Sequence, residues 1–385
     1  MSHEIDSAIV ERAARAGELI APLAAQLERE RRLPDAAVRA LADAGVFKLL
    51  VPRRYGGSEA SLATLLAVCE TIARADGSAG WCAMIGASSG LMCAFLDDAA
   101  AREVFGDAGA IACGVFAPMG RATPVAGGLR VSGRWPFASG CEHSTWRTGG
   151  TIVEGAALLP SGMPDVRSVL FRASESRVID TWDVSGLRGT GSHDLAVEDL
   201  FVPAERSFSL ISDRPKQEGA LYALPFFGVL AASVSAVALG IARAAIDALA
   251  ALAAKKQPFG ARRSLAHREL VQLEVARAEA RVRAARAFLF EAAGRAVDET
   301  GERGAASVQT RALLRLAAAH AARESAAAVD AMYGCGGATS IYAHHPLQRQ
   351  FRDVHVATQH IMVSPTAETL AGRILLGLDA DVSTL

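Results

Sequence analysis

Phe351-Arg352-Asp353-Val354-His355-Val356-Ala357-Thr358-Gln359-His360-Ile361 lies near the end of a sequence of 385 residues. The segment combines an Arg-Asp pair with two histidines, and no carboxylate follows Asp353 within it. In a helix, residues five positions apart point about 140° away from each other, so His355 and His360 are not expected to share one ligand. The last residue of the segment, Ile361, has an apolar side chain. It therefore cannot act as the base that removes a proton next to a carbonyl.

The composition is that of a large, nearly neutral chain. Hydrophobic residues make up 51% of it, and the formal net charge is -1 with both signs interspersed, so no nucleic-acid partner and no acidic membrane surface are predicted. Residues 1–27 are charged and amphipathic, unlike a signal peptide. Scattered cysteines without C-x-x-C spacing predict reduced thiols in a cytoplasmic protein; they are Cys69, Cys82, Cys93, Cys113, Cys141 and Cys335.

The order of patterns predicts helices, then strands, then helices. Apolar residues at three- and four-residue spacing indicate helices at 12–31, 35–45, 61–69 and 79–95. Short β-branched runs between Gly, Pro and Ser clusters indicate strands at 129–132, 151–153, 168–171 and 195–201. Segregated helices and strands argue against a parallel α/β sheet. We expect a mainly α chain with an inserted β module: an N-terminal helical domain (1–108), a central antiparallel β domain (109–212) and a C-terminal four-helix bundle of long helices (213–385).

One segment, 221–242, carries no charge and is long enough to cross a bilayer. Its many Ala, Ser and Gly residues favour close contact between helices. We therefore expect a helix buried on all sides in the bundle, and no membrane partner.

A tryptophan turn and a glycine-rich loop lie in the predicted β module. Trp135-Pro136-Phe137-Ala138-Ser139-Gly140 is typical of a strand that ends in a small-residue turn, with a tryptophan that belongs either to the core or to a site. The loop Ser185-Gly186-Leu187-Arg188-Gly189-Thr190-Gly191-Ser192 has three glycines, but no strand-turn-helix unit follows it. The loop is therefore not a dinucleotide-binding fingerprint, and a connection between two strands is favoured.

Two further motifs lie in the predicted bundle. Residues 255–263 place Lys256 three positions before Phe259, followed by two arginines. Residues 333–338 contain Gly336 and Gly337, which suit a helix stop because glycine adopts positive φ. Asp353 is expected to pair with Arg352 or to cap a neighbouring helix.

The late histidines do not have the spacing of a metal site. Neighbouring imidazoles on one helix face need a separation of four residues, and no pair among them has it. No metal is predicted at His344, His345, His355 and His360.

In the order of its elements the chain resembles the acyl-CoA dehydrogenase fold over essentially its whole length. In dehydrogenases of that family an Arg-Asp pair precedes a Tyr-Glu-Gly step that carries the catalytic carboxylate. Laid on Arg352-Asp353, that carboxylate position falls at Ile361, and His360 precedes it. The residue pattern Trp-x-Phe-x-Ser-Gly at 135–140 resembles the family's flavin-dependent monooxygenase branch more than its dehydrogenases.

That branch implies the oxygenase component of a two-component system. It uses reduced FMN or reduced FAD from a separate flavin reductase, reacts with O2 through a C4a-hydroperoxyflavin, and oxygenates an aromatic or heteroaromatic small molecule. A homotetramer is implied as well. Such an enzyme needs a fixed hydroxyl at flavin N5, a hydrogen-bond donor near the peroxide and a dry pocket.

The resemblance also implies site residues. Ser139 is the candidate hydroxyl at N5, and His360 is the candidate donor. Lys256 stands where the family often has an arginine that reaches a neighbouring subunit's flavin pyrophosphate, and a lysine lacks the bidentate fork, so FMN and FAD both remain open. The expected cofactor contacts are Trp135, Phe137, Ala138, Ser139, Thr190, Ser192, Lys256, Phe259, Gly336 and Gly337.

The substrate side departs from the family. Several members of the branch have a substrate-contacting histidine in the helix before the β module, and residues 81–90 contain none. An apolar or weakly acidic ring is therefore favoured over a phenol. The candidates for substrate contact are Trp81, Ser88, Ser89 and Phe116.

Two alternatives stay open on the sequence. A dehydrogenase or oxidase of the same fold would need a relocated base, for which Glu142, Asp194 and Glu368 are the candidates. A non-catalytic ligand-binding relative would be compatible with the lost carboxylate and the altered Lys256.

Overall fold

The computed structural model describes residues 4–158, 162, 164–383 and 385. Six helices come first: α1 (Ser7–Ile20), α2 (Ala24–Glu30), α3 (Asp35–Asp43), α4 (Leu62–Ala75), α5 (Gly77–Ser89) and α6 (Asp98–Phe105). The strands follow: β1 (Ala112–Val125), β2 (Gly128–Trp135), β3 (Trp146–Val153), β4 (Val166–Arg172), β5 (Arg177–Ile179), β6 (Asp194–Pro203) and β7 (Ser207–Phe208). The last helices are α7 (Phe226–Lys255), α8 (Glu269–Arg303), α9 (Val308–Gly336), α10 (Pro346–Ala357) and α11 (Pro365–Leu375).

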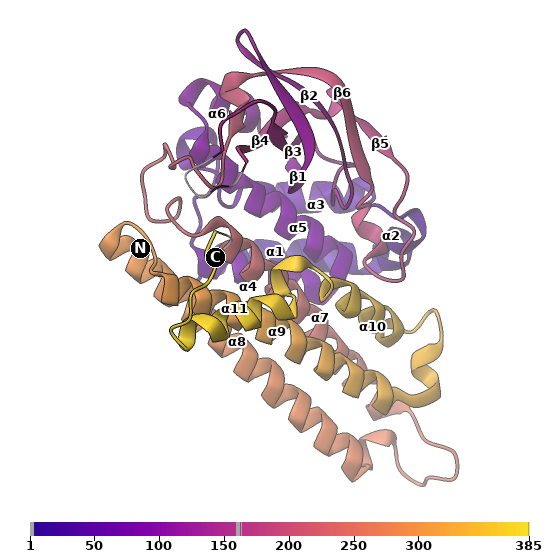
Figure 1. The fold of residues 1–385 in the computed structure, drawn as a ribbon. Helices are drawn as coiled ribbons and strands as arrows, with labels where there is room; N and C mark the ends of the chain where they lie inside the picture. Colours follow the sequence, from indigo (N-terminus) through magenta and orange to yellow (C-terminus); the bar gives the residue numbers. More distant parts are fainter. Residues whose placement is uncertain (1–3, 159–161, 163, 384) are drawn as a thin grey trace.

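The elements form three parts. Figure 1 shows the sheet at one end, the first helices beneath it, and the bundle of α7 to α11 on the far side. The predicted mainly α fold with a β module is confirmed. The bundle differs in detail, because it has three long helices of 30, 35 and 29 residues and two short ones rather than four long ones.

Side-chain caps fix where several helices begin. The side chains of Asp6, Ser61, Asp76 and Ser307 each accept a hydrogen bond from the backbone N–H three residues further on. Such a cap satisfies one of the free N–H groups of the first turn. Gly304 ends α8 in the left-handed conformation, with φ +77°.

The sheet has the strand order β5-β6-β2-β1-β3-β4-β7. Every neighbouring pair is antiparallel except β1 and β3, which run parallel from Ala112 opposite Trp146. The expectation of a purely antiparallel module is therefore wrong at this pair. The cause is the connection 136–145, which crosses over from β2 to the far edge of β1, and this crossover carries Ser139.

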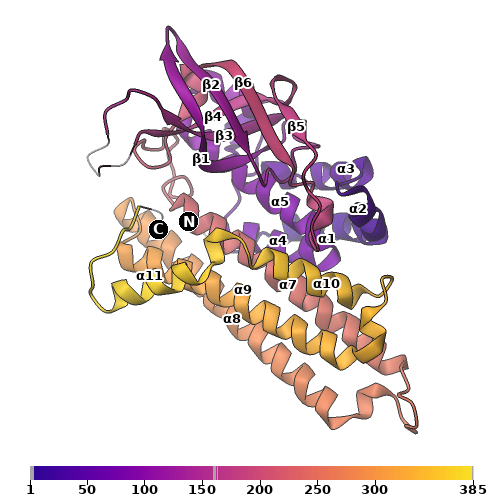
Figure 2. The same cartoon turned by 45° about the vertical axis from the view of Figure 1, so that its right-hand side comes forward.

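Two large hydrophobic cores hold these parts, and a small third cluster joins α9, α11 and Leu385. The larger core joins α1 to α6 with α7 to α10, and the smaller one lies in the β module. Two helical stretches, Gly77–Phe95 and Phe226–Lys255, are long and apolar enough to span a bilayer, but 89% and 94% of their most apolar windows are buried inside the protein. The buried helix expected from 221–242 is confirmed as α7, which runs through the middle of the bundle (Figure 2).

The smaller core is built around one tryptophan. Trp135 is fully buried and donates its indole N–H to the Gly150 carbonyl at 2.7 Å. A Cβ added at Gly120, Gly133 or Gly149 would lie 2.4 to 2.6 Å from its ring. These glycines therefore leave the space that the indole fills.

We predict that Gly149→Ala lowers the free energy of unfolding by about 1–3 kcal/mol, because the added methyl overpacks the rigid Trp135 ring. The matched control is Gly372→Ala in α11, where nothing lies within 4 Å of the added Cβ. That change should stabilise the protein by about 0.4–1 kcal/mol. Urea unfolding of both variants checks the pair, and equal midpoints would contradict this account of the core.

Candidate functional site

The crossover 136–145 turns at a strained residue. Phe137 has φ +65°, a left-handed conformation that non-glycine residues rarely adopt and that clusters at functional sites. The turn is tied to the glycine-rich loop, because the Ala138 N–H donates to His193 O and the Gly140 N–H donates to Thr190 O, each at 3.0 Å. As a result Ser139 is buried, while the Phe137 ring is 69% exposed.

Three buried hydroxyls follow one another behind this turn. Ser139 Oγ lies 2.7 Å from Ser192 Oγ, and Ser192 Oγ lies 2.7 Å from Thr190 Oγ1. The Thr190 hydroxyl donates to the Leu187 carbonyl at 2.8 Å. We call Ser139, Ser192 and Thr190 the hydroxyl series. The structure thus connects the tryptophan turn and the glycine-rich loop through side chains.

Two aromatic groups complete the cluster. The Trp81 indole of α5 donates its N–H to Ser139 Oγ at 2.9 Å. The His360 ring packs edge-on against Trp81, with ring centroids 5.5 Å apart. Five residues predicted from four separate segments therefore lie together in one chain.

The imidazole of His360 is neutral and has a defined tautomer. Burial lowers its pKa to about 4, and the nearby Arg315 cation contributes in the same direction. Its Nδ1 accepts the Met362 N–H at 3.3 Å, so the proton of the neutral ring stands on Nε2. His360 can therefore donate a hydrogen bond at neutral pH without carrying charge.

The segment around His360 is not a continuous helix. Helix α10 ends at Ala357, and His360 caps the short 3-10 turn η10 (Ile361–Val363). The 140° expected between the histidines therefore does not apply. His355 instead pairs with Asp330 of α9 at 2.8 Å, and Ile361 is 70% exposed.

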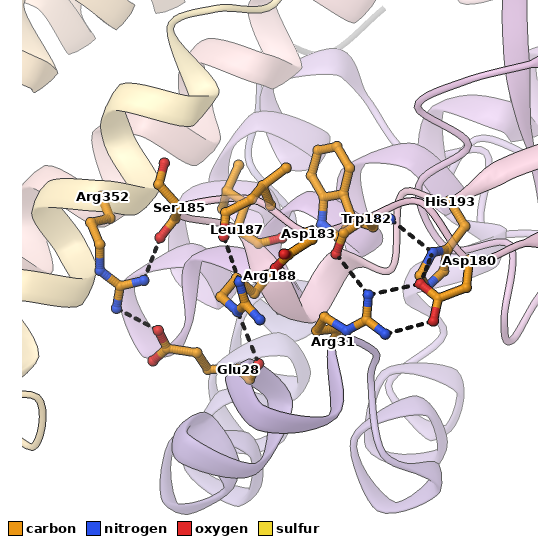
Figure 3. Close-up of polar contacts among 11 residues, drawn as sticks. Glu28, Arg31, Asp180, Trp182, Asp183, Ser185, Leu187, Arg188, His193 and Arg352 are labelled. Carbon is orange, nitrogen blue, oxygen red and sulfur yellow. Dashed lines mark hydrogen bonds and ion pairs between the residues drawn. The ribbon is translucent and has the colours of Figure 1, made fainter.

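The loop between β5 and β6 is fastened by three arginines (Figure 3). Arg31, the residue that follows α2, binds both oxygens of Asp180, at 2.7 Å each, and the Trp182 carbonyl. Arg188, within the loop, donates back to the Glu28 carbonyl of α2 and to the Val184 carbonyl. Arg352 of α10 donates to the Ser185 carbonyl and pairs with the Glu28 carboxylate at 2.5 Å. The loop is thus held between the N-terminal helices and the bundle.

A buried carboxylate holds the same loop from inside. Asp353 Oδ1 accepts the Leu187 N–H at 2.6 Å, and Leu187 has φ +49°. The expected Arg352–Asp353 pair is wrong, since Arg352 pairs with Glu28. Successive helix residues point about 100° apart, so the two side chains face different neighbours. A Cβ at Gly186 would lie 2.3 Å from Arg352 O, which is why a glycine stands there.

Asp353 is the functional residue that the sequence did not reveal. Burial, and then the neighbouring Asp76 carboxylate, raises its pKa to about 7. The sequence does indicate that Arg352 and Asp353, as adjacent residues of a helix, point in different directions. It shows that the two side chains face different neighbours, but not that Asp353 reaches Leu187.

Several predicted cofactor residues lie elsewhere. Trp135 has no exposed surface, so its side chain cannot contact a bound cofactor. Lys256 donates to the Gly336 carbonyl at 2.7 Å, Gly337 follows with φ +57°, and the Phe259 ring is fully exposed. Lys256 and Phe259 follow the end of α7, and Gly336 and Gly337 lie where α9 ends. These helix ends are at the end of the bundle away from the sheet (Figures 1 and 2). The structure does not bring them to Ser139 within one chain.

The other substrate candidates lie around α5 and β1. Ser88 is buried and donates to the Ile85 carbonyl of its own helix at 3.2 Å, and Ser89 is buried beside it. Phe116 is half-buried and packs edge-on against Phe226 at a centroid distance of 4.8 Å. Neither serine is joined to the hydroxyl series by a hydrogen bond described here.

Of the three candidate bases, two are engaged away from the hydroxyl series and the third is exposed. Asp194 accepts from Arg134 at 2.6 Å and from Thr181 at 2.8 Å. Glu368 pairs with Arg323, and Glu142 is exposed beside Gly191. Within the described residues, no group of three His, Cys, Asp or Glu side chains is arranged to hold a metal ion.

Comparison with known proteins gives two family matches. Residues 6–104 match the acyl-CoA dehydrogenase N-terminal domain, and residues 232–365 match the acyl-CoA dehydrogenase C-terminal domain. The indole-3-acetate monooxygenase of Pseudomonas putida is 34% identical over 91% of this chain and 89% of its own length.

Two further proteins are similar over nearly the whole chain. The oxygenase component of an FADH2-dependent resorcinol hydroxylase from a Rhizobium species is 31% identical over 96% of this chain and 94% of its own. The crystal structure of the 3-HSA hydroxylase from Rhodococcus sp. RHA1 superposes with a TM-score of 0.90 at 28% identity and covers 100% of both chains.

Asp353→Asn should flatten the pH dependence of stability. The folded-state pKa of Asp353, about 7, lies above the unfolded value of about 3.9. The folded protein therefore gains stability by holding the Asp353 proton. This gain is complete below pH ~4 and is lost as pH rises through ~7. The asparagine keeps an acceptor for the Leu187 N–H without the charge. We expect it to stabilise the protein by roughly 3 kcal/mol more at pH 8.5 than at pH 5.

Urea unfolding at both pH values measures this effect. The control is Asp43→Asn, at an exposed position of α3. A variant whose stability follows the wild-type pH profile would show that Asp353 does not titrate as described.

Proposed function

The chain belongs to the acyl-CoA dehydrogenase family, and we propose that it is the oxygenase component of a two-component flavin-dependent monooxygenase acting on an aromatic small molecule. The observation that carries the proposal is the pairing of Ser139 and His360 across Trp81, with a neutral donor one residue before the position at which the dehydrogenases have a base. Relatives over nearly the whole chain are named as monooxygenases of indole-3-acetate and resorcinol.

The residues present fit a reduced flavin. Ser139 Oγ would meet N5 of the ring, and Phe137 would border it from the strained turn, while the Ala138 side chain is fully buried behind it. When bound, reduced FAD or FMN supplies the electrons that activate O2. The chain's own part is to hold Ser139 as a fixed hydrogen-bond partner, to donate from His360 Nε2 toward the reacting oxygen, and to exclude water with the buried Trp81.

We place the reductase in a separate protein, because a relative is named as an oxygenase component that depends on FADH2. We also propose a homotetramer. Lys256, Phe259, Gly336 and Gly337 lie where α7 and α9 end, whereas Ser139 lies in the β module, so these four residues would serve a flavin on another copy. The free buried cysteines favour a reducing compartment, the cytoplasm.

The function predicts incorporation of one atom of O2. The protein, mixed anaerobically with photoreduced FAD or FMN and an aromatic substrate, should form an oxygenated product on exposure to ¹⁸O2. Mass spectrometry should find one ¹⁸O per product molecule, without any reductase present. Indole-3-acetate and resorcinol are the first substrates to test. Quantitative release of hydrogen peroxide with every substrate offered would refute an oxygenase function.

His360→Ala is predicted to divert reduced flavin to hydrogen peroxide, because the donor near the reacting oxygen is lost. Removing one such donor costs about 10²–10³ in rate where measured in other enzymes. Since the pKa of His360 is lowered to about 4, the wild-type product yield should stay level as pH rises through 6.5.

The control is His355→Ala in the same segment, whose imidazole pairs with Asp330. This variant should keep the wild-type ratio of product to peroxide. A yield that falls around pH 6.5 in the wild type and levels in His360→Ala would mean that the charged imidazole acts instead.

A further inference from the structure

The hydroxyl series can share its protons in only one complete way. It contains three links, from Ser139 to Ser192, from Ser192 to Thr190 and from Thr190 to the Leu187 carbonyl, and it has three hydroxyl protons to fill them. A carbonyl only accepts, so the Thr190 proton goes to Leu187. The Ser192 proton must then go to Thr190, and the Ser139 proton to Ser192.

The contact with Trp81 limits the number of further hydrogen bonds that Ser139 Oγ can form. An indole N–H only donates, and it occupies one lone pair of Ser139 Oγ at 2.9 Å. With its proton given to Ser192, Ser139 Oγ keeps one free lone pair. It can accept one more hydrogen bond, but it cannot donate one without breaking a link.

The far end of the series is held firmly. The Leu187 carbonyl also accepts the Trp182 indole N–H at 3.1 Å and the Thr190 N–H at 3.2 Å, and its own N–H is bound by Asp353. Ser139, Ser192 and Thr190 are all nearly fully buried. Water is therefore kept from replacing a broken link, so turning the series costs one buried hydrogen bond, although the Leu187 carbonyl keeps its Trp182 and Thr190 N–H donors.

We propose that Ser192 and Thr190 are positioning residues that present Ser139 Oγ as an acceptor, so that the site selects reduced over oxidised flavin. Reduced flavin carries a hydrogen on N5 and donates to Ser139. Oxidised flavin has only a lone pair at N5, so Ser139 must turn its proton away from Ser192 to bind it. Turning any hydroxyl of the series leaves one buried link empty.

This inference rests on the proposed function, since it assumes that flavin N5 meets Ser139. One buried hydrogen bond corresponds to about tenfold in affinity. The selection is therefore a property of residues behind the serine and not of the serine alone.

Ser192→Ala tests the proposal, because it removes the acceptor that holds the Ser139 proton. Ser139 then becomes free to donate to oxidised N5. Dissociation constants are measured for oxidised FAD aerobically and for photoreduced FAD anaerobically. We expect the preference for reduced flavin to fall about tenfold, mainly through tighter binding of oxidised flavin. The same change should lower the two-electron reduction potential of the bound flavin by about 30 mV, toward that of free flavin.

Thr190→Val is the second variant, because it keeps the shape and removes the hydroxyl. It frees the Ser192 proton to turn toward Ser139, so the preference should fall in the same direction. The matched control is Ser325→Ala in α9, a buried serine that donates to the Ala321 carbonyl. Its preference should equal that of the wild type, and thermal melting confirms that each variant is folded.

The outcomes separate the two claims. Unchanged preference in both folded variants, with oxygenation intact in the wild type, overturns the inference and leaves the function standing. Failure of the wild type to bind reduced flavin overturns both. A preference that falls only because reduced flavin binds more weakly means a structural role for Ser192, and it also overturns the inference.

Discussion

The hydrogen bond from the Leu187 N–H to the buried Asp353 carboxylate joins the C-terminal bundle to the β module, at 2.6 Å. It holds Leu187 in a left-handed conformation that turns its carbonyl toward Thr190. From there the hydroxyl series runs to Ser139. Arg352, next to Asp353 in α10, fastens the same loop from outside through the Ser185 carbonyl. The orientation of one serine hydroxyl thus depends on a helix that comes much later in the chain.

Burial keeps the groups around this series uncharged. It lowers the pKa of His360 to about 4 and raises the pKa of the Cys82 and Cys141 thiols, whose S–H groups donate to the Thr190 and Gly191 carbonyls. A desolvated site disfavours the charged form of each group. The site therefore offers fixed dipoles whose protonation does not change near neutral pH. Asp353, with a pKa of about 7, is the exception, and it acts on the site only through a backbone N–H.

The sequence predicted the order of the parts and most of the cluster, because each rests on local pattern. Segregated periodicities indicated helices, strands and helices, and motif spelling indicated Ser139 and His360. The predictions that failed depend on the direction in which a side chain points. Trp135 lies in the core, since three glycines, one in its own strand and two in other strands, leave room for its ring only once the sheet has formed. The Asp353 contact joins segments that no local pattern relates.

The tautomer of His360 bears on the choice between oxygenation and proton abstraction. Its Nδ1 lone pair is occupied by the Met362 N–H, and its Nε2 carries the proton, so no basic nitrogen is free. To act as a base, the ring would have to give up the cap of the turn η10. Ile361, at the family's carboxylate position, faces solvent, so an acidic side chain there would not lie against Trp81 in this chain. The local backbone, and not only the lost carboxylate, therefore favours a hydrogen-bond donor at this place.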